Sequence, residues 1–326
     1  MYYEIARDLG KSFFFSGLLP ALIFVFLNAF FIMPPSDSPG LIIKAIKDNY
    51  LEVFLIAIIA LAVMLLVLNL TVIKFYEGSY KISKFLLRFF HKRNLSRHEK
   101  LYKTLQVYKE EYVNTNDDVK KNSLAHAIEQ EWTKVLPAQN KFFIPMDKRR
   151  VLPTRLGNIF AIIEEYPSIR YGMDGMVFWP RLIPVIPKEY SAMIASEKIG
   201  FDFLLNLSLL SGILGLETFV KFLSNLRLET FIISLDNFRE FKLLFLSIMF
   251  TTLFYLFYRI SLTTILSMGN LVKSCYDLFR HDVLKRMNIN IPDNIEEERL
   301  LWYRLSNYFA SGELFHYPNS EKNRAI

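Results

Sequence analysis

Two long apolar runs lie near the start of the chain. Residues 13–33 and residues 53–73 each form a run of 21 residues without a charged side chain. A helix rises 1.5 Å per residue, so a run of this length covers about 30 Å, the thickness of the hydrocarbon core of a bilayer. We predict that both runs are transmembrane helices, joined as a hairpin.

Two later apolar runs are interrupted by charge. The run 203–216 is bounded by Asp202 and Glu217, and the run 243–258 is followed by Arg259 before apolar sequence resumes. Ionisable residues at membrane depth are costly and usually face a partner or a wet cavity. Asp202, Glu217 and Arg259 are therefore candidate membrane-embedded polar residues. Asp202 could pair with Arg259, and Glu217 with Lys221, or these residues could line a pore.

The charge of the flanking segments predicts the topology. Residues 74–103 contain nine basic and two acidic residues, a net charge of +7 (9 − 2), whereas residues 34–50 have two of each. In the loop 226–241, Arg227 and Arg239 are outnumbered by Glu229, Asp236 and Glu240, a net charge of −1 (2 − 3). Because positive segments stay in the cytoplasm, we predict four spans in a bacterial inner membrane, with both termini cytoplasmic.

The basic segment after the second run has a helical pattern. Four of its basic residues recur at helical spacing, and apolar residues fill the positions between them. The basic residues are Lys81, Lys84, Arg88 and Lys92. This pattern is typical of an amphipathic helix on anionic lipid headgroups. A protein partner or nucleic acid could also bind such a patch, but no nucleic-acid recognition motif accompanies it, so nucleic acid is not expected.

These patterns predict an α-helical integral membrane protein with four transmembrane helices and a mainly helical cytoplasmic domain, an α+β arrangement being left open. We expect a first hairpin at 1–74, a cytoplasmic domain at 75–200, a second hairpin at 201–272 and C-terminal cytoplasmic helices at 273–326. The fourth helix should continue past the bilayer, because apolar residues keep a spacing of three and four from 265 to 279.

Local signals predict the ends of the cytoplasmic helices. Ser96 and Glu99 form a capping-box pattern that would open a helix to residue 112, and the next helix should end by Pro137. Thr154 should cap a helix that stops before Pro167. Residues 171–182 should form a turn and a short extended segment. A last helix should open at the sequence PDNIEEE and close near Gly312.

The central stretch carries the most distinctive motif. It reads LPTRLGN at 152–158, an acidic pair at Glu164 and Glu165, RYG-x-D at 170–174 and WPRL at 179–182. This combination resembles uncharacterised bacterial multi-pass membrane proteins. The resemblance covers about a tenth of the chain. It implies a bacterial membrane protein and assigns no activity or catalytic residue.

Arginines crowd the same stretch. Those considered as candidates for an anionic ligand or lipid are Arg149, Arg150, Arg155, Arg170 and Arg181. Their guanidinium groups suit carboxylates, phosphates and lipid headgroups alike. Internal ion pairs with nearby acidic residues, a site for an anion and a surface for a protein partner are all compatible with the sequence.

Catalytic motifs were not found. The five histidines lack zinc-ligand spacing, Cys275 is the single cysteine, and neither a phosphate-binding glycine loop nor a GxSxG elbow occurs. We therefore predict no metal, no cofactor and no enzymatic activity. The expected function is an oligomeric channel or membrane-permeabilising effector controlled by the cytoplasmic domain. The alternatives are a non-conducting anchor that recruits a cytoplasmic partner and, third, an intramembrane lipid-processing enzyme.

Overall fold

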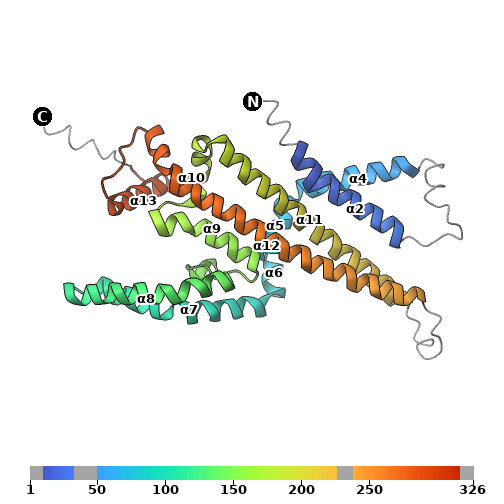
Figure 1. Cartoon of the computed structure of the whole chain (residues 1–326), viewed down its shortest axis with the longest axis horizontal. Helices are drawn as coiled ribbons and strands as arrows, with labels where there is room; N and C mark the ends of the chain where they lie inside the picture. Colours follow the sequence, from blue (N-terminus) through green and yellow to red (C-terminus); the bar gives the residue numbers. More distant parts are fainter. Residues whose placement is uncertain (1–9, 33–49, 226–237, 316–326) are drawn as a thin grey trace. The chain divides into compact units, whose positions relative to one another are not determined.

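The computed structural model describes residues 10–32, 50–225 and 238–315, and in this part of the chain every regular element is a helix (Figure 1). The helical fold class is confirmed, and no strand occurs within the described residues. The loops 34–49 and 226–237, whose charge supported the predicted topology, lie outside them.

Three helical segments are long and apolar enough to cross a membrane. They are Gly10–Phe30, Lys188–Ser224 and Phe241–Arg286. A fourth span would be a bent pair, Leu51–Val67 with Asn69–Leu86, whose axes differ by 58°. The regular helical structure is interrupted at Leu68. The second predicted span is therefore not one straight helix.

The chain divides into two compact units. Unit 1 comprises residues 1–73 and 195–265, and unit 2 comprises residues 74–194 and 266–326. Two long helices, α11 (Lys188–Asn225) and α12 (Phe238–Arg286), have residues in both units. The prediction that the fourth apolar helix continues without a break into the C-terminal region is confirmed.

Unit 1 consists of apolar helices that pack through small residues. Its elements before α11 are η1 (Phe13–Leu18), α2 (Leu19–Leu27), η2 (Asn28–Ile32), α4 (Tyr50–Val67) and most of α5 (Asn69–Glu77). Ala21 and Ala62 are fully buried in one cluster, and a Cβ on Gly17 would lie 3.0 Å from the Ala62 carbonyl oxygen. A Cβ on Gly215 would lie equally close, 3.0 Å, to Thr251 Oγ1. Such contacts let helix backbones approach closely in membrane bundles.

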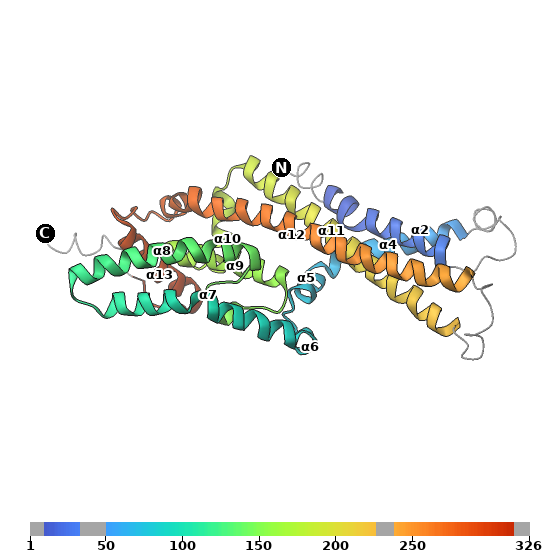
Figure 2. The same ribbon diagram turned by 60° about the horizontal axis from the view of Figure 1, so that its bottom comes forward.

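Unit 2 begins with short helix α6 (Lys81–Leu86) and a helical hairpin. The hairpin helices α7 (Arg88–Asn114) and α8 (Asp118–Phe142) lie side by side in both views (Figures 1 and 2). Asp117 caps α8 by accepting from the backbone N–H groups of Val119 and Lys120. Buried Tyr102, Leu105, Val135 and Ile144 form the core of this region.

The second part of unit 2 is built around the central motif. Its elements are η3 (Lys148–Arg150), α9 (Arg155–Tyr171), α10 (Gly175–Leu182), η4 (Ile183–Val185), the end of α12 and α13 (Ile295–Ser311). Met173, Phe178, Cys275, Leu284 and Trp302 are among the buried residues of one core. Val272 and Phe279 pack against it, so the regularly spaced apolar residues of α12 contribute to the packing of unit 2.

Some predicted helix ends are confirmed. Thr154 caps α9 by accepting from Gly157 N–H, Asn294 caps α13, and Gly312 ends α13 in a left-handed conformation with φ +72°. The break between the hairpin helices falls at residues 115–117. The caps at Thr154 and Asn294 are side-chain to backbone bonds and the one at Gly312 is a backbone bond, and all three are local, so they depend little on distant contacts.

Four other local predictions are wrong. The Ser96 capping box does not begin a helix, because α7 already runs from Arg88. Pro137 and Pro167 lie inside α8 and α9 rather than ending them. The Pro167 carbonyl still accepts a bond from Met173 N–H in the turn that closes α9. Residues 175–182 are helical rather than extended, because the Asp174 carboxylate caps the N–H groups that open α10.

Candidate functional site

The motif LPTRLGN holds the end of α5 against α9. Thr154 Oγ1 donates to the Glu77 carbonyl oxygen at 2.9 Å and accepts from Gly157 N–H at 3.0 Å. A Cβ on Gly157 would lie only 2.4 Å from the same carbonyl oxygen, so only glycine fits there. Gly78 turns the chain with φ +77° against Pro153. These residues hold the chain at the point where it leaves α5, the helix that follows apolar α4. We therefore call them the exit clamp: Glu77, Gly78, Pro153, Thr154 and Gly157.

Further hydrogen bonds hold the loop that contains Leu152 and Pro153. Leu152 N–H donates to Asn158 Oδ1 at 2.7 Å, which fixes the loop before α9 to the first turn of that helix. Asn94 Nδ2 donates to the carbonyl oxygens of Leu152 and Pro153 at 2.9 and 3.2 Å. His91 Nε2 lies 3.1 Å from the Val151 carbonyl oxygen. Helices α5, α7 and α9 are thereby joined by hydrogen bonds to one loop.

A small pocket of about 190 Å³ lies beside the exit clamp. Its polar lining includes Glu77, Ser79, Arg150 and Glu164. Burial raises the pKa of Glu164, an effect that Arg150 at 3.4 Å opposes and the Glu77 carboxylate reinforces. Two carboxylates and one guanidinium leave the lining with a net negative charge when all three are ionised.

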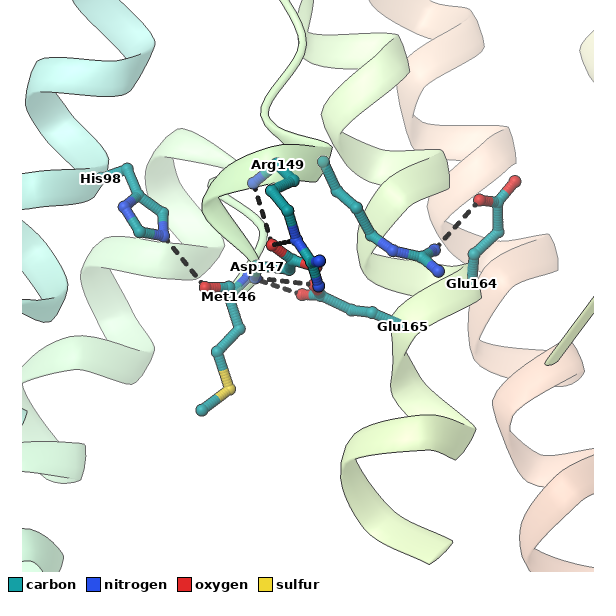
Figure 3. Close-up of polar contacts among 7 residues, drawn as sticks. His98, Met146, Asp147, Arg149, Glu164 and Glu165 are labelled. Atoms are coloured by element: carbon teal, nitrogen blue, oxygen red, sulfur yellow. Dashed lines mark hydrogen bonds and ion pairs between the residues drawn. The ribbon is translucent and has the colours of Figure 1, made fainter. Parts of the chain in front are cut away.

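The second residue of the acidic pair has a different role (Figure 3). Glu165 is buried, and its two carboxylate oxygens accept from the backbone N–H groups of Met146 and Asp147 at 2.7 and 3.1 Å. His98 Nε2 lies 2.9 Å from the Met146 carbonyl oxygen, which can only accept, so Nε2 carries the proton. Burial raises the pKa of Glu165, although the two backbone bonds partly offset this. Glu165 thus fixes the loop that follows α8.

The second half of the motif joins α9 and α10 to α12 and α13. Tyr171 and Tyr166 both donate to the Asp277 carboxylate, at 2.6 and 3.0 Å. Tyr276 donates to the Gly175 carbonyl oxygen at 2.7 Å. Gly172 has φ +71°, and a Cβ there would lie 2.6 Å from the Arg299 carbonyl oxygen. Each contact connects the motif to a helix far away in the sequence.

A buried carboxylate organises the junction of α12 with α13. Glu298 accepts from Arg280 Nε at 2.7 Å, from Trp302 Nε1 at 3.1 Å, and lies 3.0 Å from His281 Nε2. Burial alone would raise the pKa of Glu298, but the hydrogen bonds from Arg280 and Trp302 lower it below its usual value. This group is therefore ionised and stabilised by its partners at neutral pH.

Comparison with known proteins does not assign the chain to a family. No family model, curated protein or solved structure matched the chain. The resemblance of the central motif stays a prediction, and the roles of its residues rest on the contacts described above.

The candidate arginines of the central stretch are not gathered at one point. Arg149 pairs at 2.9 Å with Asp147, the N-cap residue of η3, and Arg150 pairs with Glu164. Arg181 lies over the Phe309 ring at 3.9 Å. Arg155 and Arg170 are exposed near opposite ends of α9, about 22 Å apart at 1.5 Å per residue. A single anion site built from all five is therefore not formed.

Of the two ion pairs considered for unit 1, one is formed and the other is not. Asp202 is bonded to Lys198, one turn earlier in α11, at 2.5 Å, and not to Arg259, which is exposed on α12. The carboxylate of Glu217 accepts from Asn28 Nδ2 at 2.9 Å and lies 3.3 Å from Lys221 Nζ. The predicted pairing of Glu217 with Lys221 is confirmed.

A second polar group in unit 1 was missed. Asn206 lies one turn after Asp202, and its Nδ2 donates to the Ser16 carbonyl oxygen at 2.6 Å. Ser16, Asn206 and Asp202 are 1%, 1% and 3% exposed. Each has a buried side-chain oxygen without a hydrogen-bond partner among the described residues, namely Ser16 Oγ, Asn206 Oδ1 and Asp202 Oδ1. The helical spacing of Asp202 and Asn206 was the signal that could have revealed this group.

Proposed function

We propose that the protein is an oligomeric channel or membrane-permeabilising effector whose conduction is controlled by unit 2. The observation that supports conduction is the set of buried oxygens on Ser16, Asp202 and Asn206. A buried acceptor left without a donor costs about 1–3 kcal/mol, so water or a cation bound at these oxygens would lower the free energy of the fold. Ser, Asn and Asp oxygens inside apolar helices suit a wet path for cations.

Several copies are part of this proposal. Three or four helices in one chain seldom enclose a pore, so we expect a homo-oligomer in the bacterial inner membrane with both termini in the cytoplasm. The net charge of +7 over residues 74–103 supports this orientation.

Control by unit 2 is supported by the hydrogen bonds that hold α5 and α12 within that unit. The end of α5 is held by the exit clamp, and the C-terminal part of α12 is held through Tyr276 and Asp277 by α9 and α10. Both helices continue into unit 1. A conformational change in α9 and α10 would therefore be transmitted to α5 and α12 through these hydrogen bonds, as well as through the connecting loops.

Ion flux from sealed liposomes tests the proposal. We expect the parent chain to pass monovalent cations and Asn206→Leu to reduce the rate about tenfold at equal incorporation, equivalent to about 1.4 kcal/mol. Thr252→Val is the matched control, because Thr252 is exposed on α12 and its hydroxyl bonds to the Ile248 carbonyl in its own helix. Absence of flux from folded parent protein in every lipid tested would overturn the channel.

The alternative function is a non-conducting anchor that recruits a cytoplasmic partner. The α7–α8 hairpin supports it, since Val113 and Val119 at its tip are exposed. The two functions predict different particle sizes in detergent. A ring of several copies favours the channel, whereas a monomer or a stable complex with another protein favours the anchor.

A further inference from the structure

We propose that residues 81–92, spanning α6 and the start of α7, lie in the surface of an anionic bilayer with an apolar face inserted among the lipids. This interface goes beyond conduction and does not depend on it. The four residues of the apolar face are Ile82, Phe85, Leu86 and Phe89.

No described residue of the chain covers the apolar face. Its four side chains are 73%, 76%, 70% and 72% exposed, in chain order. Their spacing of three, one and three residues places them along one side of a helical segment. Ser83, which lies between them in sequence, is buried and donates to the Tyr80 carbonyl oxygen, so the opposite side of α6 faces the protein. A face of this kind requires an apolar environment.

The charge of the segment indicates which partner covers the apolar face. Lys81, Lys84, Arg88, Lys92 and Arg93 are all exposed, and no acidic residue occurs between Glu77 and Glu99. A second copy of the same segment would bring like charges together. A nucleic acid would match the charge but would leave Ile82 and Leu86 in water. Anionic lipid satisfies both features, because its headgroups meet the basic residues while its acyl chains receive the apolar side chains.

The position of the segment in the chain gives a second, independent argument. Its first residues, 81–86, belong to the helix pair Leu51–Val67 and Asn69–Leu86, which is apolar enough to be a bent membrane span. Tyr80 interrupts the helix with an extended backbone just before Lys81. If the first helix of the pair crosses the bilayer, residues 81–92 begin 14 residues (81 − 67) after the end of that helix, with α5 between them. Tethering at that distance makes even weak surface binding effective.

The experiment uses the full chain reconstituted in vesicles, with buried Cys275 replaced by alanine and a fluorophore on Phe85→Cys. Spin-labelled lipid serves as quencher in vesicles of anionic or zwitterionic lipid. We expect strong quenching at position 85 in anionic vesicles. The matched control is the same fluorophore on Asn122→Cys, exposed on α8, which should not be quenched. Unchanged thermal unfolding of each labelled protein shows that the fold is kept.

Charge removal completes the test. Replacing Lys81, Lys84, Arg88 and Lys92 by glutamine should reduce quenching in anionic vesicles to the zwitterionic value. If position 85 is unquenched in both lipids, the bilayer interface is wrong. Efficient disulfide formation between two copies of the unlabelled Phe85→Cys variant would show a protein interface instead. Equal quenching in both lipids that the glutamine variant retains would overturn the requirement for anionic headgroups.

Discussion

The hydroxyl of Thr154 donates to the backbone carbonyl of Glu77 across 2.9 Å, joining the first turn of α9 to the last residue of α5. The same hydroxyl accepts from Gly157 N–H and so caps α9. One side chain therefore both begins a helix of unit 2 and fixes the helix that continues from unit 1. A residue with two roles of this kind should be sensitive to substitution.

Thr154→Val should destabilise unit 2 by about 1–2 kcal/mol, because it removes the helix cap and a hydrogen bond while keeping the shape of the side chain. Thr154→Ser keeps the hydroxyl and is the control. Denaturant unfolding of the purified protein in detergent measures the difference. Equal stability of the valine and serine variants would show that the cap and the Glu77 bond contribute nothing.

Gly157→Ala should cost about 1–3 kcal/mol, since its Cβ would lie 2.4 Å from the Glu77 carbonyl oxygen and the backbone must shift. Gly200→Ala in α11 is the matched control, because its Cβ would meet only Thr264 Cγ2 at an ordinary 3.5 Å. The control should be neutral or stabilising, as alanine favours helix. Thermal unfolding of both variants checks the prediction, and a neutral Gly157→Ala would contradict the exit clamp.

Glu165→Ala should destabilise the protein by about 2–4 kcal/mol, because two backbone N–H groups would lose their acceptor. Glu165→Gln should have a smaller effect, since its amide oxygen can accept one of the two bonds. Glu129→Gln is the control, as Glu129 is exposed and pairs with exposed His126. Increased protease cleavage after the end of α8 in the alanine variant would locate the damage. An intact loop would contradict the assigned role.

Glu298 gives a pH dependence of known sign. Its pKa is lowered in the folded state, so its contribution to stability is complete above the unfolded pKa and is lost as pH falls through the folded value. Glu298→Gln should cost about 3 kcal/mol near pH 7, and the difference from the parent should shrink toward about pH 3. The raised pKa values of Glu164 and Glu165 act in the opposite direction but are present in both proteins, so they cancel. A difference independent of pH would contradict this account.

The apolar runs determined the helical class and the segments of membrane length, because backbone polar groups in hydrocarbon must be satisfied within a helix. Local capping signals also sufficed at Thr154, Asn294 and Gly312, where the partners lie within a few residues. The same local rules failed at Pro137 and Pro167, which lie inside α8 and α9, because a proline removes one backbone hydrogen bond and the other bonds of the helix remain.

The meaning of the central motif was decided only by tertiary structure. Its glycines and hydroxyls meet residues about 80 to 130 positions away, such as Glu77 beside Gly157 and Arg299 beside Gly172. The sequence showed that Asp202 and Arg259 are charges within apolar runs, but not that Asp202 bonds to Lys198. Hydrophobic pattern and caps act over one or two helical turns and can be read from the chain. Ion pairs and close backbone contacts depend on which helices meet, and that is fixed only by the fold.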